Sequence, residues 1–223
     1  MRILAVDTSG KYGSIAFAQC GPGDVCEVLE VVPLEGGTFS AQLLPQIAAL
    51  LSKHKLGKYD IEAFAVVSGP GSFTGLRVGL SAIKALAEIL NKPITTVSLL
   101  EAIAAAQTDY SRVFAVLDAG RAEAYVGEYD LNPVPIKRSE CLLTRPEMVS
   151  AVGNQKLVTP DKSIADFAHG AGLAVIEIER PRSDVIARLG WGKLQTGKTV
   201  TPEDLEANYI RRSDAEIFSK PNL

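Results

Sequence analysis

The sequence predicts an α/β protein of two lobes, each built on a mixed β-sheet. Two observations lead to this prediction. Short apolar, β-branched runs alternate along the chain with segments of helical periodicity, which is typical of α/β units. The opening plan of strand, aspartate, polar turn and strand occurs twice, around Asp7 and around Asp118, which indicates a duplicated unit. We therefore expect two related lobes with a cleft between them.

The first half of the chain predicts one complete α/β unit. A hairpin of strands 3–6 and 14–18 encloses Asp7 and a polar tip. The later elements are a strand at about 25–33, a helix at 40–51, a strand at 61–68, a helix at 75–91, a strand at 93–97, and a helix from Ser98 through Gln107. The helix at 40–51 follows from apolar residues spaced three and four apart. It contains Pro45, which fits only in about the first turn of a helix.

The second half repeats the opening and is then less regular. Strands at 113–117 and 124–129 flank the turn after Asp118. Turn signals are frequent in residues 130–200, where the pattern indicates helices near 145–152, 162–171 and 183–195 and a strand near 173–178. The segment Thr201-Pro202-Glu203-Asp204 is typical of a helix start, with an N-cap, a proline at the first helical position and acids in the first turn.

Composition and charge argue against several protein classes. The 223 residues are 47% hydrophobic and carry a net charge of −3, which argues against a chain that binds nucleic acid alone through its phosphates. The start, Met1 to Asp7, is charged after only four apolar residues, so we interpret it as a first strand and not as a signal peptide. No apolar run approaches the roughly 20 residues that span a bilayer.

The cysteines and histidines predict neither a disulfide framework nor a metal site. Cys20, Cys26 and Cys141 are an odd set without C-x-x-C spacing, which favours a reducing cytoplasm. His54 and His169 are far apart, and neither belongs to an H-x-x-x-H pattern. We interpret both as lone surface histidines.

The most specific motif is the glycine-rich stretch from Ser68 to Gly79, between the buried strand and the helix that follows it. Such a turn exposes backbone N–H groups at the positive end of a helix dipole, so it either holds an anion or lets another backbone approach closely. It lacks the Lys-Ser or Lys-Thr of a P-loop. Gly69, Gly71 and Gly75 are also spaced one residue too far apart for the Rossmann fingerprint.

Four motifs together resemble the TsaB family, also called YeaZ. They are Asp7-Thr8-Ser9, the stretch Gly69-Pro70-Gly71-Ser72-Phe73-Thr74-Gly75-Leu76-Arg77-Val78-Gly79, the segment Asp118-Ala119-Gly120-Arg121-x-Glu123-x-Tyr125, and Tyr209-Ile210-Arg211. The resemblance covers essentially the whole chain. It implies a two-lobed fold of the actin/Hsp70/sugar-kinase type, that is, a duplicated RNase H-like fold. Residues 1–105 would form the N-terminal lobe, and 106–223 a smaller C-terminal lobe whose last helix packs back on the first.

This resemblance implies an accessory subunit and not an enzyme. TsaB proteins dimerise with a larger paralogue, TsaD, through first-lobe helices, and the complex recruits the ATPase TsaE. The complex transfers a threonylcarbamoyl group to the adenosine beside the anticodon of tRNA. The implied location is the cytoplasm, with tRNA reached only through the complex and no membrane involved. No cofactor is expected; a nucleotide at the partner interface and a homodimer of the isolated chain are further alternatives.

The family comparison also implies that this subunit lacks the catalytic metal. TsaD carries a metal-binding H-x-x-x-H motif near the start of its first helix. The matching stretch here, Gly37 to Pro45, contains no histidine, and Phe39-Ser40-Ala41-Gln42 replaces the His-Ser-Glu of many relatives. Without imidazoles or clustered carboxylates, a Zn²⁺ or Fe ion has no ligands at this position. A second departure is Ala207, which stands where the family often has proline.

Two sets of candidate site residues follow. The predicted interface consists of apolar and small residues on helices 40–51 and 75–91: Leu43, Leu44, Ile47, Leu51, Gly75, Gly79, Ala82 and Ile83. The predicted ligand loops and motifs contain Asp7, Thr8, Ser9, Gly69, Gly71, Ser72, Thr74, Arg77, Asp118, Arg121, Glu123, Tyr209 and Arg211. Either helix stripe would equally serve to pack its helix on its own sheet, and Asp and Gly form plain turns without a ligand. No residue is predicted to be catalytic or to bind a metal.

Other functions stay open as alternatives. A small ATPase or kinase of the same superfamily would bind Mg²⁺–ATP with Asp7, Asp118 and the glycine loop, but no acidic residue stands out as its general base. A glycoprotease-like peptidase would need a nucleophile, a base or a metal that two undistinguished histidines do not supply. The sequence does not decide whether cations near the C-terminus contact tRNA: Arg182, Arg188, Lys193 and Arg211.

Overall fold

The computed structural model describes residues 1–22, 25–132 and 134–211. The chain divides into two compact units. Of the described residues, the first contains Met1–Ala102 and Arg180–Ala207, and the second contains Ile103–Glu179 and residues 208–211. A division into two lobes at residue 105 would place residues 180–207 in the second lobe, whereas they belong to the first unit.

The first unit is built on a five-stranded mixed sheet in the order β3-β2-β1-β4-β5. Its strands are β1 (Arg2–Asp7), β2 (Tyr12–Cys20), β3 (Cys26–Glu35), β4 (Ala63–Gly69) and β5 (Ile94–Ser98). β2 pairs antiparallel with β1 and β3, whereas β1, β4 and β5 run parallel. β4 is buried at every residue, which explains its continuous run of small and apolar side chains.

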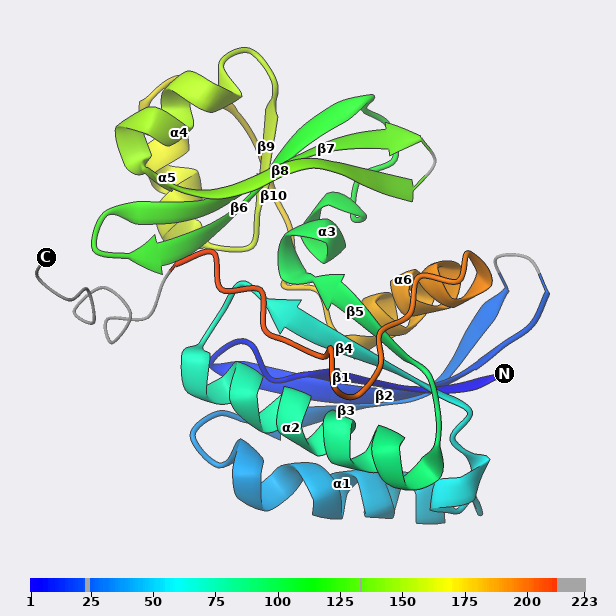
Figure 1. Ribbon diagram of the computed structural model, residues 1–223. Coiled ribbons are helices and arrows are strands. Elements are labelled where there is room, and N and C mark those ends of the chain that lie inside the picture. Colours follow the sequence, from blue (N-terminus) through cyan, green and yellow to red (C-terminus); the bar gives the residue numbers. More distant parts are fainter. Residues whose placement is uncertain (23–24, 133, 212–223) are drawn as a thin grey trace, which may run out of the picture. The chain divides into compact units, whose positions relative to one another are not determined.

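Helices cover both faces of this sheet. α1 (Phe39–Lys53) and α2 (Phe73–Leu90) lie together on one face, and α6 (Ser183–Gln195) covers the other (Figure 1). α6 approaches closely because Gly190 has no side chain: a Cβ atom there would lie 2.5 Å from the Cβ of Ala65. At its start the N–H of Ser183 donates to Ser14 Oγ at 2.9 Å, which anchors the helix to β2.

The second unit repeats the plan in the order β10-β9-β6-β7-β8. Its strands are β6 (Arg112–Gly120), β7 (Glu123–Asn132), β8 (Val134–Thr144), β9 (Lys156–Thr159) and β10 (Ala174–Glu177). β6 pairs antiparallel with β7, which pairs antiparallel with β8, and β6 also pairs parallel with β9, which pairs parallel with β10. β1 has the same arrangement, with β2 and β3 on its antiparallel side and β4 and β5 on its parallel side. The predicted duplication is therefore confirmed.

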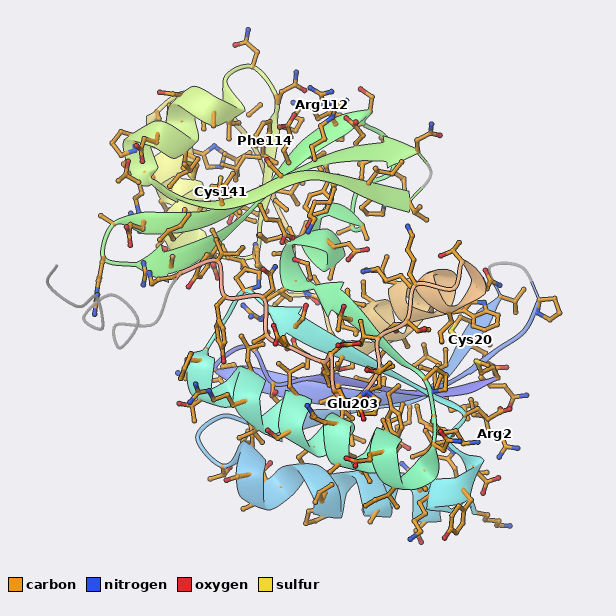
Figure 2. All side chains as sticks on the ribbon, in the orientation of Figure 1. Arg2, Cys20, Arg112, Phe114, Cys141 and Glu203 are labelled. Atoms are coloured by element: carbon orange, nitrogen blue, oxygen red, sulfur yellow. A yellow bond between two sulfur atoms is a disulfide. The ribbon has the colours of Figure 1, made fainter. Side chains whose placement is uncertain are left out.

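Two helices cover one face of this second sheet. α4 (Arg145–Val152) and α5 (Lys162–Gly170) pack on it through Met148 and Ile164. Phe114 from β6 is buried in the same cluster, and Cys141 from β8 packs against it; both are labelled in Figure 2. This cluster is the hydrophobic core of the second unit.

The remaining helical elements are short. α3 (Leu99–Ala104) follows Ser98, whose N–H donates to the Glu101 carboxylate at 3.4 Å as the predicted capping box requires. It ends before the expected Gln107, because the N–H of Gln107 bonds to the carbonyl of Ala104 in a tighter turn. A 3₁₀ helix, η1 (Lys58–Asp60), precedes β4. No helix of the described residues is long and apolar enough to cross a membrane.

Three local expectations are wrong. Pro45 lies well inside α1 and not in its first turn; its side chain is exposed, so the ring stands on the outer side of the helix. No helix begins at Thr201, where the N–H of Asp204 bonds to Thr201 Oγ1 and the chain forms only a turn. Two strands, β8 and β9, lie in the segment of 130–160 for which the sequence indicated turns and one helix.

The cysteine prediction is also wrong. Cys20 and Cys26 face each other in the register of β2 and β3 and form a disulfide, while Cys141 is free. Spacing rules missed this pair because the two cysteines flank a hairpin turn, and only the register of the two strands brings them together. A reducing environment inferred from cysteine spacing therefore loses its support.

Candidate functional site

The first hairpin, between β1 and β2, holds Asp7 in a fully enclosed position. Asp7 is 2% exposed, and its Oδ1 accepts the N–H of Ser9 at 2.8 Å and the hydroxyl of Ser9 at 2.6 Å. Burial raises the pKa of Asp7 above its ordinary value, although the bonds from Ser9 and the nearby charge of Arg180 oppose the change. The carboxyl group is thus bound by its own turn and does not project as an open ligand.

Arg180 covers the tip of this hairpin. Its Nη2 lies 3.5 Å from Ser9 Oγ, and a Cβ atom on Gly10 would meet the same Nη2 at 2.9 Å. The Arg180 Nε is buried and makes no hydrogen bond to any residue that the structure describes. A cation of the chain itself therefore occupies the polar side of the hairpin.

The glycine loop between β4 and α2 is used for close packing. A Cβ atom on Gly71 would lie 2.3 Å from the carbonyl oxygen of Ser9, and the N–H of Ser72 donates to that oxygen at 2.7 Å. The Ser72 hydroxyl caps α2 by accepting the N–H of Gly75 at 3.3 Å. Gly69 has a φ of 133°, which favours glycine. Of the two uses predicted for this loop, the close approach of another backbone is the one observed.

Two polar residues of the motif lie at the surface of α2. Thr74 is exposed, and Arg77 stacks on the ring of Phe73 with 3.7 Å between the guanidinium carbon and the ring centroid. Phe73 is itself 38% exposed. All three side chains are exposed, although they follow the glycine loop directly in the sequence.

Most of the predicted interface faces inward, which corrects the assignment. Gly75 and Gly79 are buried against Thr8 of the first hairpin, and Ile83 is fully buried. On α1 the inward residues are Phe39, Leu43, Ile47, Leu50 and Leu51. Of the predicted set, only Leu44, at 51% exposure, and the half-buried Ala82 reach the surface. The strongest apolar stripe of each helix packs on its own sheet, as is usual for an amphipathic helix.

A second, weaker apolar stripe lies on the opposite side of both helices. We call it the outer face; it consists of Ala41, Leu44, Pro45 and Ala48 on α1 and Val78, Ala82, Ala85 and Ile89 on α2. Ile89 is 71% exposed. The outer face could have been recognised in the sequence, because α1 and α2 have alanine, leucine and isoleucine at positions where a surface helix usually has charged residues.

The second hairpin, between β6 and β7, gives Asp118 several partners. Its Oδ1 accepts the N–H of Gly120 at 2.9 Å, and its Oδ2 accepts the hydroxyl of Ser163 at 2.7 Å and lies 3.5 Å from Arg145. Burial opposes ionisation, but these two bonds and the Arg145 charge hold the pKa of Asp118 below its ordinary value. Asp118 thus ties the hairpin to the first turns of α4 and α5.

Arg211 of the C-terminal motif contacts the same hairpin. Arg211 forms an ion pair with Glu123 and donates to the carbonyl of Ala119 at 2.9 Å. Its guanidinium also lies 6.0 Å from the ring centroid of Tyr125. Arg121 is exposed at the hairpin tip, and Tyr209 is 38% exposed. The C-terminal motif therefore fastens the end of the described chain to the second hairpin.

Comparison with known proteins decides the family. The family model for tRNA N6-adenosine threonylcarbamoyltransferase, TsaD, matches residues 31–155. The tRNA threonylcarbamoyladenosine biosynthesis protein TsaB of Escherichia coli is 30% identical over 96% of both chains. This chain belongs to the TsaB family.

Solved structures share the fold with this TsaB-family chain. YeaZ from Pseudomonas aeruginosa is 24% identical and matches with a TM-score of 0.75 over 93% of this chain and 99% of that one. The activator of 2-hydroxyisocaproyl-CoA dehydratase from Clostridium difficile, solved with bound ADPNP, is 11% identical with a TM-score of 0.52 over 89% of this chain and 97% of that one. The predicted two-lobed, actin-like fold class is confirmed.

The start of α1 corresponds to the metal-binding motif expected in TsaD. In this TsaB-family chain it contains no metal-ligating side chain. The start of α1 is Phe39-Ser40-Ala41-Gln42, of which Phe39 is buried. Nowhere in the described residues do three or more His, Cys, Asp or Glu side chains gather closely enough to hold a metal ion. These residues do not fit a bound transition metal.

Three of the four cations considered for tRNA contact are engaged within the chain. Arg188 donates to the carbonyl of Cys26 at 2.8 Å, and Lys193 bonds to Glu101 at 2.6 Å. Arg211 holds the second hairpin, as described above. The fourth, Arg182, is largely exposed and lies 3.7 Å from Asp184.

Proposed function

We propose that this chain is the non-catalytic dimerisation subunit of the complex that forms threonylcarbamoyladenosine in tRNA. The transfer step attaches a threonylcarbamoyl group to the adenosine next to the anticodon. The observation that carries the proposal is the exposed apolar outer face of α1 and α2 in a chain of the TsaB family. An apolar patch over two neighbouring helices is typical of a protein–protein interface.

The outer face supports a helix-to-helix interface of close approach. Leu44 and Ile89 are its large exposed side chains, and alanines and one proline fill the space around them. Small residues let a partner's helices lie near the backbone of α1 and α2, while Leu44 and Ile89 provide apolar anchors. The two helices are in contact along one face of the sheet, so they form a single surface (Figure 1).

A TsaD-like paralogue is the partner that fits this surface. The TsaD family model matches residues 31–155 of this chain, a range that includes both α1 and α2. A TsaD-like protein therefore carries a related pair of helices. Two related faces pack around an approximate twofold axis, as in most dimers. A homodimer of the isolated chain would use the same face.

Several contacts support the absence of catalysis in this chain. The two hairpin aspartates are engaged by Ser9 and by Ser163 and Arg145, and Arg180 covers the first hairpin. A Mg²⁺–ATP complex would have to displace these groups to bind at either hairpin. The catalytic chemistry therefore belongs to the paralogue, with the ATPase TsaE joining the assembled complex and tRNA binding through the complex, in the cytoplasm.

Depletion of this chain in its own organism tests the proposal. The fraction of threonylcarbamoyladenosine in total tRNA is measured by mass spectrometry of nucleosides before depletion, after depletion, and after complementation with the wild-type gene. The proposal predicts that the modified fraction falls on depletion and returns on complementation. Unchanged modification after complete depletion would exclude the proposed role.

A further inference from the structure

Thr8 lies against α2 at two glycines and leaves no room for a side chain on either. Its hydroxyl donates to the carbonyl of Gly75 at 2.7 Å. A Cβ atom on Gly75 would lie 2.1 Å from the carbonyl oxygen of Thr8, and one on Gly79 would lie 2.3 Å from Thr8 Oγ1. Cβ atoms in folded proteins do not approach other atoms so closely, so the first half of α2 rests directly on Thr8.

This contact determines how close α2 lies to the sheet. Leu76, on the inner side of the same turns, is 2% exposed, and Ile83 is fully buried. Val78 and Ala82 are half-buried and belong to the outer face. Because a helix moves as a stiff rod over a few turns, lifting Gly79 away from Thr8 also displaces these outer residues.

We propose that Thr8 is the positioning residue for the outer face: it sets the height of α2 and thereby the shape that the TsaD-like partner contacts. The inference rests on the proposed function, because it concerns the same face. It assigns a role to the first hairpin that needs no nucleotide. In this chain the first hairpin supports α2 on the side opposite the outer face.

The chain offers a clash that a second substitution should relieve. Gly79→Ala places a Cβ against the Thr8 hydroxyl, and Thr8→Ala removes that hydroxyl; the next nearest atoms, the Thr8 Cβ and Cγ2, lie 3.5 and 3.6 Å away. We expect Gly79→Ala to weaken affinity for the TsaD paralogue about tenfold or more. The double variant Thr8→Ala/Gly79→Ala should bind within about threefold of the Thr8→Ala single variant.

Gly75→Ala is the matched control. Its Cβ meets the backbone oxygen of Thr8, which Thr8→Ala does not remove, so the loss of affinity should persist in the Thr8→Ala background. Affinity is measured by calorimetric titration with the purified paralogue, at a temperature where circular dichroism shows every variant folded. Lost binding then reports the position of α2 and not unfolding. Where Gly79→Ala alone fails to fold, the double variant still has to fold and bind.

The outcomes separate this inference from the proposed function. Wild-type binding together with unaltered binding of Gly79→Ala would overturn the positioning role and leave the interface intact. A loss in Gly79→Ala that Thr8→Ala does not restore would overturn it as well. No binding by the wild-type chain would overturn the proposed function itself, and the inference with it.

Discussion

Asp7 and Asp118 hold equivalent places in the two units: the Oδ1 of each accepts the backbone N–H of the residue two positions later, at 2.8 and 2.9 Å. The duplicated fold thus has the same aspartate-to-backbone hydrogen bond near the end of β1 and of β6. Their surroundings differ. Asp7 is enclosed by its hairpin, whereas Asp118 also binds Ser163 and Arg145 from neighbouring helices. The pKa of Asp7 is consequently raised and that of Asp118 lowered.

Substituting the two aspartates should change stability in opposite directions. A group whose pKa is raised in the folded state makes its full contribution to stability below its unfolded pKa. That contribution is lost as the pH rises through the folded pKa. Asp7→Asn should therefore be more stable than wild type at neutral pH, with the advantage shrinking as the pH falls. The asparagine oxygen still accepts the N–H of Ser9. Urea unfolding at about pH 7 and about pH 4 measures the effect.

Asp118→Asn is the matched comparison. A lowered pKa contributes stability above the unfolded pKa, and that contribution is lost as the pH falls through the folded pKa. This variant should be less stable than wild type at neutral pH, and the deficit should close in acid. If both variants moved in the same direction at neutral pH, the contrast between the two hairpins would be wrong.

Ile89 on the outer face has a matched control outside it, Ile136. Ile89 on α2 is 71% exposed, and Ile136 on β8 of the second unit is 52% exposed. A glutamate in an apolar interface is desolvated without a partner, so Ile89→Glu and Leu44→Glu should each weaken binding of the TsaD paralogue about a hundredfold. Ile136→Glu should bind like wild type. Equal losses at Ile89 and Ile136 would show that the docking surface lies elsewhere.

The tip of the second hairpin carries measurable backbone strain. Arg121 and Ala122 form the two-residue loop between β6 and β7, with φ values of 54° and 61°. Residues with a Cβ atom disfavour this region, so Ala122→Gly should raise the free energy of unfolding by about 1 kcal/mol. Ala151→Gly, at an exposed helical position in α4, should instead lower it by about 0.5 kcal/mol. Denaturant titration of both variants checks the signs; destabilisation by Ala122→Gly would contradict the strain.

Local pattern predicted much of the fold and little of the site. The strands predicted at 3–6 and 113–117 lie within β1 and β6, and the strand predicted at 61–68 overlaps β4, which begins two residues later; fully buried strands are continuous apolar runs. β8 was missed because its exposed, charged residues alternate irregularly along an edge strand. The disulfide of Cys20 and Cys26 was missed because it depends on the register of two strands, which spacing does not reveal.

Most of the residues predicted for the interface lie on the inward side of α1 and α2. Helical periodicity identified Leu43, Ile47 and Gly79 as one-sided stripes, but it does not say which side meets the sheet of the same chain and which meets a partner. In both helices the stronger stripe faces inward, and the side chains left at the surface are those of the outer face, including Leu44 and Ile89. The ion pair between Arg211 and Glu123 was likewise not predicted, because the two residues are far apart in sequence.

The most direct test of the accessory role is reconstituted threonylcarbamoyl transfer to tRNA. Purified TsaD, TsaE and the adenylate-forming enzyme of the same organism are assayed with and without this chain, and the chain is assayed alone. If this chain is an accessory subunit, modified tRNA should form only when it accompanies the others, and none should form from the chain alone. Full modification in its absence would contradict the account and would direct attention to ATP hydrolysis by the chain itself.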